Sequence, residues 1–314
     1  MDLSIIIVNY NTTEHLSKNL DSIFYSTKNL MYEIIVVDNN SSDKEIEKFP
    51  LLYPKVKFFF RNSNDGFGAA CNYGSKHATG KYFLFVNPDI IFENYSLVKI
   101  FGFMESNENV ALSSGVLYGE DGSNVYTYNY FPDIKWEFTE ALGKGSERKI
   151  KKLLSNEKII LKHSEALEVD WVMGAFMFII AKVFKKIGRF DETFFLYYED
   201  IDLQRRIKNS GYKIVVLPFV KIFHLEKSSV KNSEGENIYY FHMNRSKMIY
   251  FYKHFSFVKR NFTRLMFIVG YFFRFITLPF RKIQRKRETK ILPVYFNIKD
   301  IFFHKGENIL LYNK

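Results

Sequence analysis

Two short acidic motifs carry the side chains best suited to chemistry, and the first of them ends at Asp89. The motif Asn87-Pro88-Asp89 directly follows the apolar run Tyr82–Val86. Hard divalent cations prefer carboxylate oxygens, and Mg²⁺ often takes only one or two from the protein while phosphates and water fill its shell. Asp89 is therefore a candidate ligand for a cation that stabilises a departing diphosphate. The competing explanation is an ordinary turn, in which Asn, Pro and Asp are all common.

The second motif is Glu199-Asp200-Ile201-Asp202, which directly follows two tyrosines. A carboxylate at the mouth of a site, flanked by aromatic rings that limit water, can accept the proton of an attacking hydroxyl group. Like charges this close should raise the pKa of at least one of the three acids. Asp200 is the candidate base. A helix N-terminus, whose dipole favours acidic residues, also explains part of the motif, above all Asp202.

His224 and Trp171 are weaker candidates for a site. As a neutral imidazole, His224 could complete the shell of a metal, although a lone histidine is more often structural. Trp171 precedes Gly174 by three residues. Its indole ring could stack on a sugar, although an aromatic residue beside an apolar run is most often part of the core.

Short strands and helices alternate along the first part of the chain and must position these side chains. Four apolar runs too short for helices predict strands: Leu3–Val8, Glu33–Val37, Val56–Phe60 and Tyr82–Val86. Three mixed segments between them predict helices: Glu14–Tyr25, Asp43–Tyr53 and Gly66–Ala78. This alternation predicts an α/β fold with a mostly parallel sheet and helices on both faces. Further along we expect strands at Asp170–Ala181 and Lys213–Leu217, and a helix at Leu203–Ser210 that ends at Gly211.

Each of the four early strands ends in a polar cluster: Asn9-Tyr10-Asn11, Asp38-Asn39-Asn40, Asn62-Ser63-Asn64-Asp65 and Asn87-Pro88-Asp89. In an open α/β sheet such strand ends lie along one edge, and ligands bind outside them. One cluster would be an ordinary loop, whereas four in succession predict a site for a polar ligand.

A glycine-rich segment, Gly66-Phe67-Gly68, leads into the third predicted helix. The N-terminus of that helix could face a phosphate group. The dinucleotide fingerprint is incomplete, because Cys71 stands in place of its third glycine and the segment does not follow the first strand. A nucleotide-dependent oxidoreductase is therefore disfavoured.

The composition excludes a disordered chain and a disulfide-stabilised one. Hydrophobic residues make up 47% of the 314 residues, and Cys71 is the single cysteine. An intrachain disulfide is impossible, which fits a reducing compartment. The sequence opens on its first predicted strand without a basic leader, so we expect a cytoplasmic protein.

The net charge of +11 is concentrated near the C-terminus. Residues 244–290 hold thirteen Lys/Arg and one acidic residue, which leaves 32 basic and 33 acidic residues elsewhere. The aromatic, amphipathic stretch Phe255–Phe280 lies here, followed by the basic run Arg281–Arg287. Its longest apolar part, Leu265–Phe273, is well short of the roughly 20 residues that span a bilayer.

Such a helix is typical of a segment lying in an anionic membrane surface. We therefore expect peripheral contact at the inner face of the cell membrane. Packing on the rest of the protein and a contact between two copies are the alternatives. Nucleic-acid binding is disfavoured, because no recognition fold accompanies the charge.

With these residues in place, the chain resembles the inverting GT-A glycosyltransferases of family 2, especially bacterial rhamnosyltransferase-like members. The resemblance runs from about Leu3 to His254. The matching pieces are, in order, Ser4–Asn11, Ile35–Asp43, Asn64–Asn72, Phe85–Asp89, Gly174, Glu199–Leu203 with Arg206, Gly211-Tyr212 and His224. Each piece is weak alone, but their order and spacing together are strong.

The resemblance implies a role for each matched residue toward a dTDP- or UDP-sugar donor. Val8, Asn9 and Tyr10 would line the nucleotide base, and Asp38 would bind its pyrimidine ring. Residues in and beside the glycine-rich segment would lie along the diphosphate or the sugar: Asn64, Gly66, Phe67, Gly68 and Asn72.

Asp89 and His224 would bind Mg²⁺ or Mn²⁺. Asn87 stands where this family has the first Asp of its DxD motif, and its neutral oxygen would leave the metal held mainly by Asp89. Asp200 would be the base. Trp171, Gly174 and Glu199 would border the acceptor.

The implied reaction is a single in-line displacement that inverts the anomeric carbon. It would move a sugar, with rhamnose as one option, to a glycan or lipid-linked acceptor in bacterial surface polysaccharide synthesis. A non-catalytic nucleotide- or carbohydrate-binding protein on the same fold is the alternative, although it would have no need of a base. Homo-oligomerisation is left open.

The implied organisation is a catalytic GT-A domain over residues 1–235, with a nucleotide-sugar half at about 1–115 and an acceptor half at about 116–235. A helical, basic C-terminal region would follow at 236–314. Within the acceptor half, the charge runs of Phe131–Glu168 indicate a mobile insertion or lid.

Overall fold

The computed structural model describes residues 1–277 except 28, 124, 126, 135–164 and 226–232. The chain divides into two compact units. The first contains the main sheet and its helices, and the second contains α9 (Ser233–His254) and α10 (Phe257–Thr277) with the short segment Leu196–Tyr198. Most of the expected insertion at Phe131–Glu168 and all of Arg281–Arg287 lie outside the described residues. None of the described helices combines the length and the apolar character needed to cross a bilayer.

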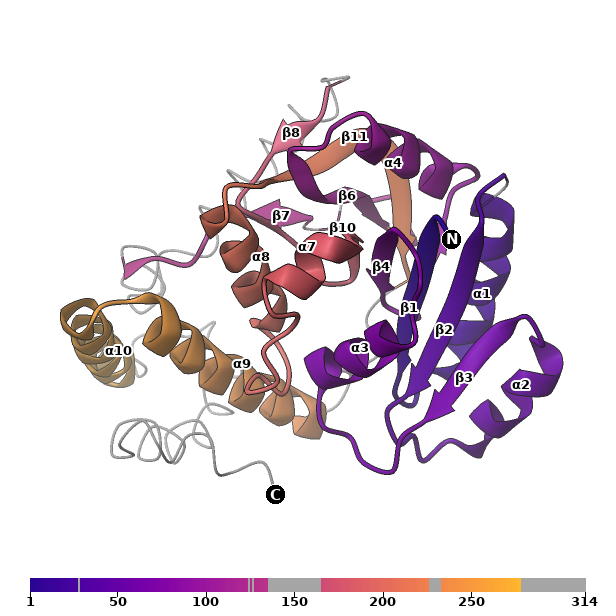
Figure 1. Cartoon of the computed structure of the whole chain (residues 1–314). Helices are drawn as coiled ribbons and strands as arrows, with labels where there is room; N and C mark the ends of the chain where they lie inside the picture. Colours follow the sequence, from indigo (N-terminus) through magenta and orange to yellow (C-terminus); the bar gives the residue numbers. More distant parts are fainter. Residues whose placement is uncertain (28, 124, 126, 135–164, 226–232, 278–314) are drawn as a thin grey trace. The chain divides into compact units, whose positions relative to one another are not determined.

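The first unit is built on a nine-stranded mixed sheet in the order β3-β2-β1-β4-β10-β6-β11-β5, with β8 paired to β11 (Figure 1). Its strands are β1 (Leu3–Asn9), β2 (Tyr32–Asp38), β3 (Val56–Phe60), β4 (Tyr82–Val86), β5 (Ile90–Phe92), β6 (Val110–Gly119), β8 (Leu167–Glu168), β10 (Phe176–Ile180) and β11 (Lys213–His224). The first four strands are parallel to one another, as predicted. β10 then runs antiparallel between β4 and β6.

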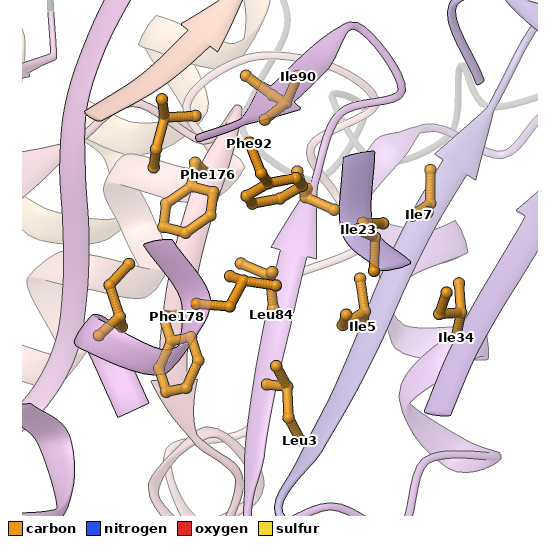
Figure 2. Packing of buried hydrophobic residues seen from close by; sticks show 14 of the residues in the cluster. Leu3, Ile5, Ile7, Ile23, Ile34, Leu84, Ile90, Phe92, Phe176 and Phe178 are labelled. Carbon is orange, nitrogen blue, oxygen red and sulfur yellow. The ribbon is translucent and has the colours of Figure 1, made fainter. Parts of the chain in front are cut away.

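Helices cover both faces of this sheet, which confirms the predicted layering. They are α1 (Thr13–Ser26), the 3-10 helix η1 (Lys44–Lys48), α2 (Phe49–Leu52), α3 (Phe67–Lys76), α4 (Ser96–Glu105), α7 (Ala181–Lys186) and α8 (Glu199–Asn209). Alternate residues of β1 enter two separate cores: Ile5 and Ile7 pack with α1, and Ile6 and Val8 pack with α3. Figure 2 shows the first of these cores, in which Ile23 of α1 lies over Ile5 and Ile7. Fully burying one such side chain stabilises the fold by about 1.5–3 kcal/mol.

Three expectations about local structure are wrong. The helix expected at Asp43–Tyr53 is broken into η1 and α2, because Pro50 lacks an N–H and cannot continue a helix begun before it. The single strand expected at Asp170–Ala181 is two strands, β9 (Trp171–Val172) and β10, separated by a turn at Gly174-Ala175. β9 pairs with β7 (Tyr128–Asn129) in a separate small sheet. The strand expected at Lys213–Leu217 is longer: it continues as β11 to His224, because β5 pairs with its last residues.

Glu33, at the start of β2, is buried and accepts hydrogen bonds from β1, from β3 and from the loop before β4. Its carboxylate accepts from the hydroxyl of Ser4 (2.7 Å), from the amide and hydroxyl of Thr79 (2.8 and 2.7 Å) and from Lys57 (2.7 Å). Burial by itself raises the pKa of this carboxyl group, but the bonds from Lys57, Ser4 and Thr79 outweigh it and lower the pKa to about 2.

We predict that the stability supplied by Glu33 depends on pH. Its folded pKa lies below its unfolded value of about 4.3, so the contribution is complete above that pH and is lost as pH falls toward 2. Glu33→Gln should lower the free energy of unfolding by about 2 kcal/mol at pH 7 and by progressively less toward pH 3. Urea unfolding of both proteins across this range measures the difference. Glu14→Gln, at an exposed carboxylate, is the control; a Glu33 difference that stays constant with pH would contradict the account.

Candidate active site

The ends of β1 and β2 hold a buried carboxylate in a fixed orientation. The parallel register places Asn9 opposite Asp38, and the Asn9 side-chain amide donates to Asp38 Oδ1 (2.8 Å). Ser41 donates its hydroxyl to Asp38 Oδ1 (2.6 Å) and its amide to Oδ2 (3.0 Å). Beside this network Val8 is buried, whereas Tyr10 is 49% exposed. Sequence reasoning missed Ser41 as part of the site; an Asp followed three residues later by Ser is the signal that could have indicated it.

Asn39 joins this edge to the loop before α3. Its side-chain amide donates to Asn64 Oδ1 (2.7 Å) and to the carbonyl of Gly66 (3.3 Å). Its own Oδ1 accepts from Arg61 (2.9 Å), which also pairs with Asp65. The structure therefore brings Asn64 and Gly66 to the end of β2. Asn39 was predicted only as a member of the polar cluster after β2, and Arg61 was not singled out from the sequence.

The first turn of α3 packs tightly against Phe195. Gly66 has φ +97°, and a Cβ there would lie 2.1 Å from the carbonyl oxygen of Phe195, so a glycine is required. The amide of Phe67 donates to that same oxygen (3.0 Å), which occupies one of the N–H groups at this helix end. Gly68 lies beside Glu199, since a Cβ on it would be 3.6 Å from the Glu199 side chain.

Asn72 lies farther along α3 and is buried. Its side-chain NH₂ group donates to the carbonyl of Phe190 (2.9 Å) and to Glu192 (2.8 Å), and its Oδ1 accepts from the Phe190 amide (3.1 Å). All the hydrogens of its amide are thus used within the protein. Asn72 ties α3 to the loop after α7.

Asp89 and His224 form a pair at the opposite end of the same sheet edge. The antiparallel pairing of β5 with β11 sets Ile90 opposite His224, and the Leu225 amide donates to the Asp89 carbonyl (2.9 Å). His224 Nε2 then lies 3.2 Å from Asp89 Oδ2. The side chain of Asp89 is only 17% exposed, and that of His224 only 11%. Asp89 Oδ1 and His224 Nδ1 are buried without a hydrogen-bond partner.

These two residues fit a divalent cation. An unpartnered buried carboxylate oxygen beside an imidazole nitrogen is costly to the folded protein unless a ligand satisfies it. Mn²⁺ and Mg²⁺ prefer carboxylate oxygen, and a neutral imidazole nitrogen is a common ligand of divalent metals. In the described part of the chain no group of three or more His, Cys, Asp and Glu side chains could share a metal. Phosphate oxygens and water would therefore have to supply the rest of the shell.

Gly174 and Ala175 link the loop of Asp89 to the base candidate. β10 pairs with β4 so that Phe176 lies opposite Val86, and the Asn87 amide donates to the Ala175 carbonyl (3.0 Å). One residue earlier, the Gly174 amide donates to Asp200 Oδ2 (2.9 Å). A Cβ at Gly174 would lie 2.9 Å from that oxygen, so the close approach needs glycine.

Asp200 and Glu199 begin α8 and differ in environment. Asp200 is partly buried, and its two oxygens accept from the backbone amides of Gly174 and Ile201 (2.9 and 2.8 Å). Burial raises the pKa of Asp200 to about 6, against the opposing effect of these amides. Glu199 is 5% exposed, and Glu199 Oε2 has no hydrogen-bond partner. Burial first, and the Asp200 charge second, hold the pKa of Glu199 well above its usual range.

Asp202, the third acid, is paired with a cation. It is fully buried and meets Arg206 at 2.8 Å, one turn along α8. Arg206 also donates to the carbonyls of Ile187 and Arg189 (both 2.7 Å). The expectation that like-charge crowding raises at least one of these pKa values is confirmed, but burial is the larger cause.

Trp171 is set by the small sheet of β7 and β9. Its indole Nε1 donates to the carbonyl of Tyr130 (2.9 Å), and the ring is partly exposed. Its neighbour Val172 exchanges two hydrogen bonds with the side chain of Gln204 on α8 (2.7 and 2.8 Å). Trp171 therefore lies on a strand that is attached directly to the helix of Asp200.

The sequence comparisons identify one family. Residues 4–188 match the model of glycosyl transferase family 2. The chain is similar to the rhamnosyltransferase WbbL of Escherichia coli, at 27% identity over 228 residues, or 70% of this chain and 82% of the relative. It is also similar to the N-acetylglucosaminyl-diphospho-decaprenol L-rhamnosyltransferase of Mycobacterium tuberculosis, at 22% identity over 253 residues, or 75% of this chain and 80% of the relative.

A solved structure, that of GalNAc-T7 with UDP, GalNAc and Mn²⁺, resembles the fold. The TM-score is 0.55 at 16% sequence identity, over 80% of this chain and 50% of that one. At this identity the likeness concerns the fold alone, and it confirms the expected GT-A architecture.

We predict that Asp89 and His224 bind Mn²⁺ together with a nucleoside diphosphate. The loss of the free Mn²⁺ signal in electron paramagnetic resonance, with UDP present, measures this binding. Asp89→Asn and His224→Ala should each weaken it at least about tenfold. Asp65→Asn, at an exposed carboxylate on the same edge, should bind as the unmodified protein does. Unchanged Mn²⁺ binding in both site variants would contradict the assignment.

Proposed function

The chain belongs to family 2 of the glycosyltransferases, and from this premise we propose that Asp200 is the base of an inverting sugar transfer. The donor is a nucleotide-diphosphate sugar, and the acceptor is a hydroxyl group of a glycan or of a lipid-linked sugar. The observation that carries the proposal is the state of Asp200, a carboxylate with a pKa of about 6 that is held by two backbone amides. One of these amides belongs to Gly174, and the next residue, Ala175, accepts a hydrogen bond from Asn87 in the loop of Asp89.

The pKa of Asp200 suits a base that works near neutral pH. At pH 7 a carboxyl group of pKa about 6 is mostly ionised, yet it accepts a proton more readily than an ordinary aspartate. The amides of Gly174 and Ile201 fix both oxygens, so the carboxylate needs little reorganisation when the hydroxyl group arrives. The acceptor oxygen attacks the anomeric carbon as Asp200 takes its proton, and the bond to the nucleoside diphosphate breaks.

The donor half of the site rests on the ends of β1, β2 and β4. Asp38, fixed by Asn9 and Ser41, is an acceptor for the imide N–H of a pyrimidine, and the exposed ring of Tyr10 offers it a flat face. This favours a UDP or dTDP donor. Asp89 and His224 would hold Mg²⁺ or Mn²⁺, with Asn87 beside them. When bound, such an ion supplies charge stabilisation to the leaving diphosphate.

The transferred sugar is proposed to be rhamnose, and the acceptor to be lipid-linked. Both relatives described above are named as rhamnosyltransferases, and the name of the mycobacterial one includes a diphospho-decaprenol acceptor. Trp171 would border the acceptor. The catalytic domain would end near residue 235, and its nucleotide-sugar half would meet its acceptor half near residue 115. A non-catalytic binding protein is not favoured, because a partly buried, amide-bound carboxylate of raised pKa is unneeded for binding alone.

A stripe of exposed apolar residues on α10 supports contact with a membrane surface. Its members recur every three or four residues and are 44–75% exposed: Val258, Phe262, Leu265, Val269 and Phe272. The helix carries four Lys/Arg and no acidic residue. Apolar residues on one face and positive charge favour an anionic lipid surface over a second copy of this positively charged helix.

We predict that Asp200→Asn binds donor normally and loses about 10²- to 10⁴-fold in turnover. In the unmodified enzyme kcat/KM should fall tenfold per pH unit below about pH 6, because the base must be ionised and its pKa is about 6. Released nucleoside diphosphate, measured from pH 5 to 8, reports both quantities. Asp200→Asn turning over near the normal rate would show that another group is the base.

A methyl group at position 174 should displace the base without unfolding the protein. We predict that Gly174→Ala lowers kcat at least about tenfold, because its Cβ would lie 2.9 Å from Asp200 Oδ2. Gly102→Ala is the matched control: nothing lies within 4 Å of a Cβ there, and α4 should gain about 0.5–1 kcal/mol. Normal turnover in Gly174→Ala would mean that the Gly174–Asp200 contact is unimportant for catalysis.

The α10 stripe should govern membrane binding. We predict that the protein co-sediments with vesicles containing phosphatidylglycerol, less so in high salt, and that Phe262→Ser/Leu265→Ser weakens binding at least about tenfold. Leu51→Ser/Leu52→Ser removes two leucines of α2 that are 87% and 66% exposed, and should leave binding intact. Equal vesicle binding by both double variants would refute the role of the stripe. A dimer that only the α10 variant loses would instead assign this face to a second copy.

A further inference from the structure

The segment Leu196–Tyr198 ends one residue before Glu199 and two before the base, yet it belongs to the C-terminal unit. The residues before it and after it belong to the unit of the sheet. The chain therefore enters α8 from a segment that packs with α9. This arrangement connects the C-terminal helices to the catalytic residue through three residues of backbone.

Two buried residues of α9 hold this segment. Ser246, which is 2% exposed, donates its hydroxyl to the carbonyl of Leu196 (2.8 Å). The ring of Tyr250, which is fully buried, lies 5.5 Å from the ring of Tyr198 at an angle of 57°. The two contacts are one helical turn apart on α9, so they fall on the same face of it. One contact fixes the start of the segment and the other fixes its end.

The segment has a conformation that needs such support. Tyr197 and Tyr198 have φ of +67° and +66°, in the left-handed region that residues with a side chain rarely adopt. Strained backbone of this kind persists where surrounding contacts hold it in place, and it is concentrated at functional sites. On the other side of the segment, the Phe67 amide holds the carbonyl of Phe195.

We propose that Ser246 and Tyr250 are positioning residues for the sugar transfer: by holding the turn at Tyr197-Tyr198 they fix where α8 begins, and with it the place of Asp200. This inference rests on the proposed role of Asp200. It gives α9 a part in catalysis that is separate from any membrane contact of α10. It also means that a change in the C-terminal unit reaches the base along the chain itself.

Ser246→Ala tests the proposal with the full-length protein. We expect kcat to fall about tenfold while the KM for the donor changes less than about twofold, because the donor site lies at other strand ends. We also expect the acid limb of kcat/KM to move, because the pKa of Asp200 depends on its burial and on the bonds from the amides of Gly174 and Ile201, and both depend on where α8 begins. The substitution changes no charge, so Glu199, Asp202 and Arg206 around the base remain as they are.

Thr263→Val is the matched control. Thr263 is also buried in the C-terminal unit and donates its hydroxyl to a backbone carbonyl (2.9 Å), but that carbonyl is Lys259 of the same helix. This variant should keep normal kcat and a normal acid limb. Equal losses in Ser246→Ala and Thr263→Val would overturn the proposal, since general loosening would then explain both. A folded Ser246→Ala variant with a normal kcat and a normal acid limb would also overturn the proposal.

Tyr250→Leu and Tyr250→Phe give a second, independent test. The leucine variant should reproduce the Ser246→Ala phenotype, and the phenylalanine variant, which keeps the ring against Tyr198, should restore most of kcat. Equal loss in both would overturn the role given to the ring. If Tyr250→Leu does not fold, by circular dichroism and thermal melting, Ser246→Ala decides alone. Asp200→Asn in the same assay distinguishes failure of the proposed base from failure of this inference. Full activity in Asp200→Asn refutes the proposed base. Loss of activity in Asp200→Asn together with normal activity in Ser246→Ala refutes this inference only.

Discussion

The hydrogen bond from the Gly174 amide to the Asp200 carboxylate is the contact on which the rest of the site depends. It requires a residue without a side chain at position 174, since a Cβ there would lie 2.9 Å from the carboxylate oxygen. It requires the break between β9 and β10, which turns the Gly174 amide toward α8. It also requires β10 to lie beside β4, because that pairing sets Ala175 against Asn87 and so brings the loop of Asp89 next to the base. The antiparallel strand inserted between β4 and β6 is thus the feature of the fold that unites the two acidic motifs.

The three acids of the second motif show how one helical turn produces three electrostatic outcomes. Glu199 is buried without a cation, and its raised pKa favours the neutral form. Asp202 is buried as deeply but meets Arg206 at 2.8 Å. Asp200 lies between these extremes, partly buried and bonded to two amides, with a pKa of about 6. Desolvation favours the neutral acid and amide bonds favour the ion. At Asp200 desolvation prevails, but the amide bonds oppose it, and the resulting pKa of about 6 makes this residue, and not its neighbours, suited to receive a proton.

Local sequence patterns predicted the parallel half of the fold well because those patterns have local causes. The aromatic-rich runs at Val56–Phe60 and Tyr82–Val86 coincide with β3 and β4, and Gly211 follows α8 with φ +86° as a helix-ending glycine should. The polar clusters after β1, β2 and β4 share one edge because parallel strands end together. The parts that were missed depend on partners far away in the chain. Nothing within Asp170–Ala181 indicates that its two halves pair with different sheets, and nothing near Asp38 indicates that Asn9, from another strand, will hold it. The contacts of α9 with Leu196–Tyr198 span about fifty residues and have no local signal.

The reaction proposed for this site is a single in-line displacement in which Asp200 takes the proton of the acceptor. The configuration of the product tests it most directly, because a single displacement inverts the anomeric carbon, whereas two displacements through an enzyme-bound sugar retain it. With a donor that supports release of nucleoside diphosphate, nuclear magnetic resonance of the freshly formed glycoside gives the anomeric configuration from the coupling of the anomeric carbon and its hydrogen. We predict the configuration opposite to that of the donor. A product with the donor's configuration would contradict it, since Asp200 would then have to act in a reaction of a different kind.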